Sequence, residues 1–402
     1  MRYFVILLGF IFITSCDNVV NEKLDLGWYV GNLEVEKDKY LPFDFSVIND
    51  STLVVSNSSE LVEFKVEYLQ DSIFIKSKIF EGYIKGVLDK GVINGVFIIE
   101  SLDRSIPFHS VNSSDRFDIQ FEENKKLTLN SWKFIFNPDL ANESYSIGMF
   151  ESIGNNKINA TFRTNTGDYG FMEGGYKDNK LLLSTFNGSR AYLLEAEFKG
   201  DSIKGVIYQG NHSKMTIKGV VDNDFKLADA YALTYLKNNN ASFDFSFENT
   251  KGDLVSINDD VYTDKSLVIQ LMGSWCPNCL DESIFYVDYL SNNVLKDVEF
   301  IGLAFEYAKT KELAINSILK LKNEIGINYP ILLAQYGGTN KKEALKKFPM
   351  LNNIISYPTT IFVNKSKEVV KIHTGFNGPA TGEKYIDFVK EFDKTIKSMI
   401  AN

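Results

Sequence analysis

Cysteine and histidine are scarce in this chain of 402 residues, which contains three of each. A structural zinc site usually takes four such ligands from two paired clusters. His109, His212 and His373 all lie more than sixty residues from the pair Cys276 and Cys279, so the sequence offers no such cluster. So few cysteines also argue against a fold held together by disulfides. We therefore predict neither a metal site nor a disulfide framework.

An excess of positive charge is also lacking. The chain has 43 Lys and Arg against 52 Asp and Glu, which gives a formal net charge of −9. This balance argues against nucleic acid as a partner and against a basic membrane-binding surface. With 44% hydrophobic and 13% aromatic residues, the chain is long enough for two or three domains with real cores.

The N-terminal apolar run is short. Tyr3–Ile13 follows Arg2 and contains eleven residues, whereas a membrane-spanning helix needs about 20. The run ends in Thr14-Ser15-Cys16, which resembles a bacterial lipobox with Ile13 in the usual leucine position. We predict a lipoprotein signal peptide over residues 1–16, lipidation at Cys16 and a periplasm-facing mature protein in the cell envelope. Simple secretion with Cys16 as a leftover thiol is the alternative.

Residues 25–222 contain almost no helical signal. Short runs of alternating apolar and polar residues are separated by Gly, Asn and Asp turns, and 20 tyrosines and 31 phenylalanines favour strands. The glycine-rich stretch Thr164–Gly175 has no helix after it, so it is interpreted as a hairpin turn and not as a phosphate loop. His109 and His212 stand alone and are interpreted as ordinary surface or turn residues.

This β-rich region also repeats itself. Tyr68–Ile75 aligns with Tyr176–Leu183, and Gly91–Val96 aligns with Asp201–Val206, at offsets of 108 and 110 residues. Two long copies are too few for a solenoid and fit a duplicated sandwich or barrel. The predicted halves are residues 25–110 and 128–222. Residues 223–242 form the predicted linker, with a short helix over Leu227–Lys237.

The most informative stretch is Ser266–Cys279, with the sequence SLVIQLMGSWCPNC. Its apolar run predicts a buried strand that is covered on both faces. Pro277 suits the first position of a helix, because its missing N–H has no partner there in any case. Cys276 is therefore predicted at a helix N-terminus, where free N–H groups favour a thiolate over a thiol.

Two cysteines separated by two residues in a first helical turn can form a reversible disulfide. Cys276 can attack a partner's disulfide, and Cys279 can resolve the mixed disulfide that results. The attacking thiol in such settings has a pKa of roughly 3.5–7.5 instead of about 8.5. An inert stabilising disulfide is the alternative, but so short a bridge closes almost no loop. The predicted redox centre is the Cys276–Cys279 disulfide, without another cofactor.

The run GSWCPNC and the later Tyr357-Pro358-Thr359-Thr360 resemble the TlpA/ResA-like family of membrane-tethered thiol:disulfide oxidoreductases, which have the thioredoxin fold. The resemblance covers residues 243–402. It implies that the bond before Pro358 is cis, that Pro358 faces the cysteines and that the backbone of Tyr357 pairs with a substrate chain. Trp275 and Pro277 would line the same groove. A trans proline at a strand start is the alternative.

Glu282 lies one helical turn after Cys279 and matches the glutamate of the CxxCxxE motif in ResA-like proteins. A partly buried carboxylate there could accept and return the proton of the resolving thiol; an exposed helix acid is the alternative. Gln270 stands where thioredoxin has a buried aspartate, so the proton route must differ. Glu306 is a weaker candidate. His373 is interpreted as a satisfied loop histidine, and a position on the active-site rim is the alternative.

The remaining C-terminal pattern alternates strands and helices around this centre, as expected of a mixed sheet flanked by helices. The lysine-rich segment that begins at Lys341-Lys342 is interpreted as a solvated helix face. The predicted elements are a hairpin over Phe243–Ile257, strands over Val298–Phe305, Tyr329–Ala334, Thr359–Val363 and Glu368–His373, and helices over Lys311–Ile325, Lys341–Lys347 and from Glu383.

Together these features predict a lipid-anchored thiol:disulfide oxidoreductase that reduces disulfides of exported proteins and receives electrons from an upstream donor. The charged residues nearest to the cysteines in sequence are Asp281 and Glu282, with no cation, which favours a reducing couple. A peroxiredoxin-like peroxidase is one alternative, although Gly273 stands where that class has a threonine. A β-domain binding protein with a vestigial redox domain is the other.

Overall fold

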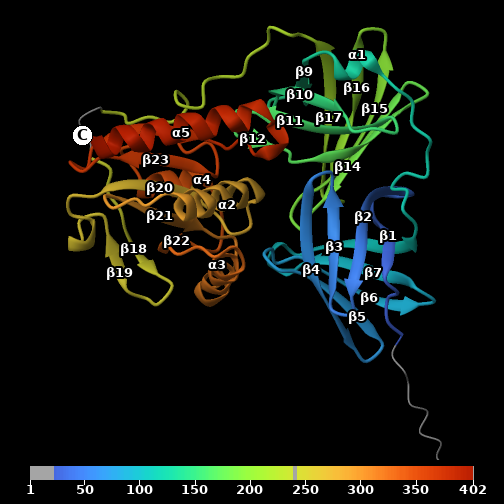
Figure 1. Cartoon of the computed structure of the whole chain (residues 1–402), viewed down its shortest axis with the longest axis horizontal. Coiled ribbons are helices and arrows are strands. Elements are labelled where there is room, and N and C mark those ends of the chain that lie inside the picture. The colour runs from blue at the N-terminus through green and yellow to red at the C-terminus, as the bar shows by residue number, and fades with distance from the viewer. Residues whose placement is uncertain (1–21, 239–241, 402) are drawn as a thin grey trace, which may run out of the picture.

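The computed structural model describes residues 22–238 and 242–401 (Figure 1). The chain forms two β-barrels in succession and then a C-terminal α/β domain. The predicted signal segment 1–16 and Cys16 lie outside the described residues. Within these ranges, none of the helices is both long and apolar enough to cross a membrane.

The first barrel is a closed ring of eight strands, each antiparallel to the next, in which β8 pairs back with β1. Burial alternates along strands such as β3 and β5, because successive side chains of a strand face opposite sides. Phe43, Phe45 and Phe64 fill its core. The strands are β1 (Gly27–Glu36), β2 (Lys39–Asn49), β3 (Thr52–Asn57), β4 (Glu60–Leu69), β5 (Ser72–Ser77), β6 (Tyr83–Asp89), β7 (Val92–Ile99) and β8 (Arg104–Asn112).

The second barrel also closes, since β10 pairs with both β9 and β11 and β17 returns to β9. Trp132, Phe134 and Phe162 fill its core, and a short helix, α1 (Lys125–Thr128), precedes it. Its strands are β9 (Trp132–Phe136), β10 (Ser144–Ser152), β11 (Lys157–Thr164), the added β12 (Gly167–Asp168), β13 (Met172–Lys177), β14 (Lys180–Phe186), β15 (Ala191–Lys199), β16 (Ser202–Gln209) and β17 (Ser213–Val221).

The repeated segments occupy the same places in the two rings. Tyr68–Ile75 forms the β4–β5 hairpin and Tyr176–Leu183 the β13–β14 hairpin, in each ring the fourth and fifth strands. Gly91–Val96 leads into β7, and Asp201–Val206 leads into β16. Each of these strands is the seventh of its ring. The region is therefore all β and barrel-like. A common origin of the two halves stays a prediction.

Phe186 joins the two barrels. It ends β14 of the second barrel, yet its ring lies 4.3 Å from that of Phe43 and 5.1 Å from that of Phe97 in the first barrel. Arg116, from the connection between the barrels, is buried and pairs with Asp44 at 3.0 Å. Because one aromatic side chain completes the core of its neighbour, the two barrels form a single packed unit.

The C-terminal domain is a mixed sheet in the order β19-β18-β22-β21-β20-β23-β24, flanked by helices. β20 is buried along its whole length and is parallel to β21 and antiparallel to β23. The elements are β18 (Ser246–Asn249), β19 (Leu254–Ser256), β20 (Ser266–Met272), α2 (Pro277–Asn292), β21 (Val298–Phe305), α3 (Lys311–Ile325), β22 (Ile331–Gln335), α4 (Lys341–Lys347), β23 (Thr359–Val363), β24 (Val369–Thr374) and α5 (Glu383–Ala401). The predicted thioredoxin-like arrangement is confirmed.

The predicted helix over Leu227–Lys237 is wrong. This segment consists of turns, bends and irregular chain, and apart from the Ala232 N–H, which donates to the Asp229 carbonyl, its backbone-to-backbone hydrogen bonds with described residues go to the C-terminal domain. The N–H of Lys237 donates to the carbonyl of Met350 at 2.8 Å, and Thr374 N–H donates to the carbonyl of Ala230 at 3.0 Å. Pairing with a neighbouring loop has replaced the i to i−4 bonds of a helix here.

Candidate active site

Cys276 caps the N-terminus of α2, as predicted from Pro277. The buried strand β20 ends at Met272, and the chain turns through Gly273 to Trp275 before the helix begins. The Sγ atom of Cys276 accepts the backbone N–H of Cys279 at 3.2 Å. The free N–H groups and dipole of a sixteen-residue helix therefore point at this sulfur.

Both thiols are nearly inaccessible. The exposed fraction is 5% for Cys276 and 0% for Cys279. Burial raises the pKa of Cys279 well above its ordinary value, and the neighbouring Cys276 adds to this rise. The Cys276 thiol donates to the carbonyl of Tyr357 at 3.4 Å, and the Tyr357–Pro358 bond is cis, as predicted. Cys276 thus lies against the carbonyl that precedes the cis proline.

Glu282 is completely buried, so the alternative of an exposed helix acid is wrong. Its carboxylate accepts from Gln270 Nε2 at 2.8 Å and from Thr360 Oγ1 at 2.9 Å. Burial raises the pKa of Glu282 to about 7, while the hydrogen bonds from Gln270, Thr360 and Tyr286 hold it down. A carboxyl that changes charge near neutral pH thus lies one turn behind Cys279.

A second buried carboxylate supports the turn before the cysteines. Glu306 accepts from the Ser274 N–H at 2.8 Å and from its hydroxyl at 2.7 Å. Burial raises the pKa of Glu306 to about 7. The Trp275 indole N–H donates to the carbonyl of Phe305 at 2.8 Å, so the end of β21 fixes both sides of this turn.

His373 does not reach the active-site rim. It ends β24 in the interior, with ring centroids 4.8 Å from Tyr231 and 5.0 Å from Phe388. Burial lowers the pKa of His373 to about 4. His109 contacts Tyr40 on the first barrel, whereas His212 lines a cleft of about 330 Å³ together with Trp275 and Pro277. Residues 22–238 and 242–401 contain no group of three or more potential metal-ligating side chains.

Two loops of the second barrel cover the cysteine motif. From the β14–β15 loop, Ser189 Oγ donates to the Trp275 carbonyl at 3.0 Å, and Arg190 donates to Asn278 Oδ1 at 2.7 Å. From the β11–β13 loop, the Asp168 carbonyl accepts from Asn278 Nδ2 at 3.1 Å. The glycine-rich stretch is thus a turn, as predicted, but its contact with the active site was not predicted.

Arg190 forms the strongest of these contacts. It is 2% exposed and pairs with Asp281 of α2 at 3.0 Å. Burial alone would lower the pKa of Arg190, but the carboxylates of Asp281, Glu60 and Asp168 outweigh it and raise that pKa. Burial raises the pKa of Asp281 to about 6 against the opposing pull of Arg190.

A further cation comes from α4. Lys341 is exposed on the predicted solvated face, yet it lies close enough for the charges of Cys276 and Cys279 to raise its pKa. Partial burial has the larger effect and lowers that pKa. The sequence places no cation beside the cysteines, whereas the fold brings Arg190 of the second barrel onto Asp281, two residues after Cys279.

Comparison with known proteins agrees with this geometry. The Redoxin family matches residues 237–386. Thiol-disulfide oxidoreductase ResA of Bacillus subtilis is 22% identical over 146 residues, which are 36% of this chain and 72% of that protein. ResA of Halalkalibacterium halodurans is 24% identical over 146 residues, 36% of this chain and 73% of that protein.

The C-terminal domain is therefore similar to ResA-like thiol-disulfide oxidoreductases. Among solved structures, this chain is also similar to a thiol:disulfide interchange protein of the thioredoxin family from Chlorobium tepidum. That similarity has 18% identity and a TM-score of 0.30, and covers 40% of this chain and 97% of the other. None of these matches extends over both barrels, whose loops cover the motif that the family match contains.

Proposed function

We propose that this chain is a thiol:disulfide oxidoreductase that works through Cys276 and Cys279. The observation that supports it most is the position of Cys276 at the N-terminus of α2, where helix N–H groups favour its thiolate. Cys279 is fully buried and its pKa is raised, so it suits the second, internal attack. The two sulfurs therefore have different roles.

In the proposed reaction the Cys276 thiolate attacks one sulfur of a client disulfide, and the other client sulfur leaves as a thiolate. Cys279 then gives its proton to Glu282 and attacks Cys276 Sγ, which releases the first client sulfur. The client gains two electrons, and its two thiolates take up one proton that Glu282 returns and one from solvent, which replaces the proton that Cys276 lost on ionising. The enzyme keeps a Cys276–Cys279 disulfide. With a pKa of about 7, Glu282 suits the acceptance and return of this proton.

The proposed client groove lies beside Cys276. Trp275 and Pro277 line the cleft of about 330 Å³, and Pro358 lies buried at the base of the site. The Tyr357 carbonyl, which now accepts from the Cys276 thiol, is the backbone group that a client chain would pair with. This proposal rests on the cleft and on the match to the family motif.

Reduction is the proposed direction, although nearby charges weaken the argument made from sequence. Arg190 pairs with Asp281 beside the motif, and cations stabilise a thiolate and make a couple more oxidising. The fully buried Glu282, whose hydrogen bonds come from the uncharged Gln270, Thr360 and Tyr286, still favours the reducing side. A titration against glutathione should give a reduction potential between about −270 and −180 mV. A higher potential would mean that the protein acts as an oxidase or isomerase and not as a reductase.

The proposed location is the cell envelope, with a lipid anchor at Cys16 and the active site facing the periplasm. The lipobox-like Thr14-Ser15-Cys16 supports this proposal. The proposed partners are exported proteins with disulfides and an upstream electron donor. Cys16→Ser should move the protein from the membrane fraction to the soluble fraction, and unchanged membrane association would contradict the anchor.

The activity test is reduction of insulin by the mature protein in the presence of dithiothreitol. Cys276→Ser should abolish turnover above the dithiothreitol background, since Cys276 is the cysteine that caps the N-terminus of α2. A Cys276→Ser protein as active as the parent would remove the assignment. Absence of insulin turnover together with rapid consumption of hydrogen peroxide would favour the peroxidase instead.

The roles of the two sulfurs have a separate test. Cys279→Ser should accumulate covalent complexes with clients, because the mixed disulfide at Cys276 can no longer be resolved. Non-reducing electrophoresis would detect them, and the captured proteins would identify the client class. Complexes that form with Cys276→Ser and not with Cys279→Ser would reverse the assignment.

A further inference from the structure

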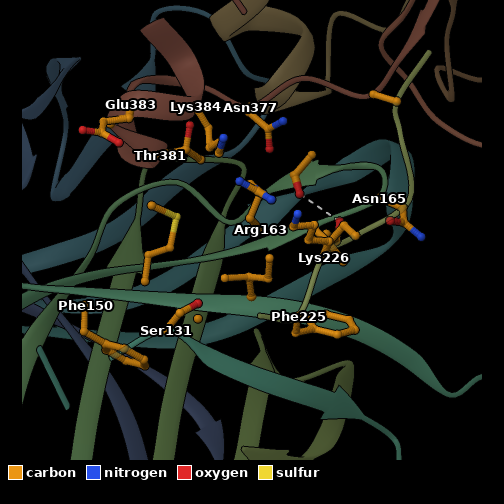
Figure 2. Close-up of a pocket in the computed structure, with 18 of the residues that line it drawn as sticks. Ser131, Phe150, Arg163, Asn165, Phe225, Lys226, Asn377, Thr381, Glu383 and Lys384 are labelled. Carbon is orange, nitrogen blue, oxygen red and sulfur yellow. Dashed lines mark hydrogen bonds between the residues drawn. The ribbon is translucent and has the colours of Figure 1, made fainter. Parts of the chain in front are cut away.

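A second cavity lies away from the cysteines, between the outer face of the second barrel and the start of α5. Its volume is about 750 Å³, within the range of roughly 300–1,000 Å³ that is usual for small-molecule sites. The segment 225–230 closes one side (Figure 2). Apolar side chains form much of its wall, among them Leu129, Met149, Phe150 and Phe225.

Arg163 of β11 reaches into this cavity and has no partner there. Figure 2 shows it between Asn377 and Lys384 of the C-terminal domain and Phe150 of the barrel. Its side chain is partly buried, but no hydrogen bond or ion pair joins the guanidinium to any residue that the structure describes. The buried Arg116 and Arg190, in contrast, both pair with carboxylates. A desolvated, unpaired guanidinium costs stability, so Arg163 does not serve the fold.

Other groups around Arg163 also suit an anion. Lys226 and Lys384 line the same cavity and add positive charge to its wall. Gly382 precedes α5 and has no side chain with which to cap the free N–H groups at the start of this nineteen-residue helix. Glu383 stands in the same wall, and its charge favours a ligand with one negative charge over a dianionic phosphate.

We propose that this cavity binds a small amphipathic carboxylate. The carboxylate pairs with Arg163 at the N-terminal end of α5, and the apolar tail lies along Leu129, Ile147 and Met149. Arg163 and the helix terminus belong to different domains, so the ligand would connect the second barrel to the thioredoxin-like domain.

Calorimetric titration of the full mature protein with decanoate, below its micellar concentration, tests this site. Decanoate should bind, whereas acetate, which lacks the tail, and decanol, which lacks the charge, should bind at least about tenfold more weakly. Arg163→Gln should weaken decanoate binding by about ten- to a hundredfold. Equal binding of decanol, or unchanged binding by Arg163→Gln, would overturn the proposal.

A stability measurement keeps this test independent of binding. Arg163→Met retains the apolar stem and removes an unpaired, partly buried charge, so the ligand-free variant should melt at a higher temperature than the parent. Insulin reduction should stay unchanged, because Arg163 does not contact the cysteine motif. A melting temperature lower than that of the parent would show that Arg163 has a structural partner and would overturn the argument.

A second inference comes from the loops over Cys276, and it rests on the proposed function. Attack requires a client sulfur within about 3.5 Å of Cys276 Sγ, but this residue is 5% exposed. The contacts that cover its motif come from loops and are polar, and the one ion pair among them is Arg190 with Asp281. Polar interfaces between domains of one chain usually permit relative motion.

We infer that the two barrels act as one lid over Cys276 and that Arg190 holds the lid closed. The barrels share the Phe186 contact, so they move together. A client gains access to Cys276 only when Ser189 and Arg190 leave Trp275, Asn278 and Asp281. The closed form protects the thiolate from unspecific oxidation, and the open form exposes the groove of Tyr357.

The test is the rate at which iodoacetamide alkylates Cys276 in a Cys279→Ser background. Arg190→Ala should raise this rate by about tenfold or more, and so should Asn278→Ala, which breaks the contact from the α2 side and leaves the barrel intact. Measuring the alkylation rate as a function of pH distinguishes a change in the accessibility of Cys276 from a change in its pKa. Unchanged rates in both variants would overturn the lid. Because alkylation needs no client, fast alkylation without insulin turnover would reject the proposed function and keep the lid.

Discussion

Each of the two barrels is a ring of eight strands, but the loops of the two barrels contact different parts of the thioredoxin-like domain. The first barrel contacts the thioredoxin-like domain at α3, where Lys320 Nζ donates to the Phe80 carbonyl at 2.6 Å. The second barrel places Ser189 and Arg190 directly on the cysteine motif. Closed rings leave few strand edges to vary, so the loops carry the difference. The first barrel thus contacts the thioredoxin-like domain at α3, whereas the second barrel covers the cysteine motif.

The largest expected effect comes from breaking the joint between the barrels. Phe186→Ala should lower the free energy of unfolding by about 3–5 kcal/mol, because it leaves a cavity in the core that contains Phe43 and Phe97. Leu69→Ala, at a side chain 63% exposed, is the control and should change this free energy by less than about 0.5 kcal/mol. Urea denaturation measures both, and separate unfolding of the two barrels in the parent would contradict a single packed unit.

Buried charge separates the barrels from the thioredoxin-like domain. Arg116 of the barrels pairs with Asp44, whereas Glu282 of the thioredoxin-like domain accepts hydrogen bonds from the uncharged Gln270 and Thr360. The pKa of Glu282 rises from 4.5 to about 7 on folding, so the folded state holds this proton more tightly than the unfolded state. Stability should therefore fall as pH rises from about 4.5 to 7 and stay reduced above that.

Glu282→Gln should remove this loss. The variant should gain up to about 3 kcal/mol over the parent at pH 8 and little at pH 5, by urea denaturation at both pH values. Glu151→Gln, on an exposed face of β10, is the matched control and should show no such pH dependence. The same variant should slow insulin reduction by about 10²-fold or less, as expected for loss of a general base. An identical pH dependence in parent and Glu282→Gln would contradict the raised pKa.

Substitutions at two glycines, one in a loop of each barrel, compare these loops directly. Gly91, in a first-barrel turn, has φ of +76° and open space around it, whereas at Gly167 (φ +128°) a Cβ would lie 2.1 Å from Asn278 Nδ2. Gly91→Ala should cost about 1 kcal/mol and leave Cys276 alkylation unchanged. Gly167→Ala should cost about 1–3 kcal/mol and speed alkylation severalfold, because the added methyl pushes the loop from the motif. Equal alkylation rates in the two variants would show that the loop of Gly167 does not help to cover Cys276.

Sequence reasoning reached what is encoded locally. The run from Ser266 to Cys279 contains its own strand, turn and helix start, and Glu282 follows at a helical spacing, so these features were predicted without the fold. The cis bond before Pro358 followed from the resemblance. Arg190 was missed because it lies 91 residues from Asp281, and no neighbouring residue signals the contact. The helix predicted over Leu227–Lys237 failed for the same reason, since its backbone partners come from elsewhere in the chain.

The smallest expected effect tests whether the first barrel belongs to the lid in its own right. Lys320→Ala and Ser189→Ala each remove one hydrogen bond to a backbone carbonyl, on Phe80 and Trp275 respectively, so each should cost about 1 kcal/mol or less. Because only Trp275 adjoins Cys276, Ser189→Ala should raise the alkylation rate about threefold and Lys320→Ala by less than about twofold. If Lys320→Ala raised the rate as much as Ser189→Ala, the α3 contact would also hold the lid closed. Both barrels would then hold the lid closed, and the loops of the two barrels would no longer differ in this role.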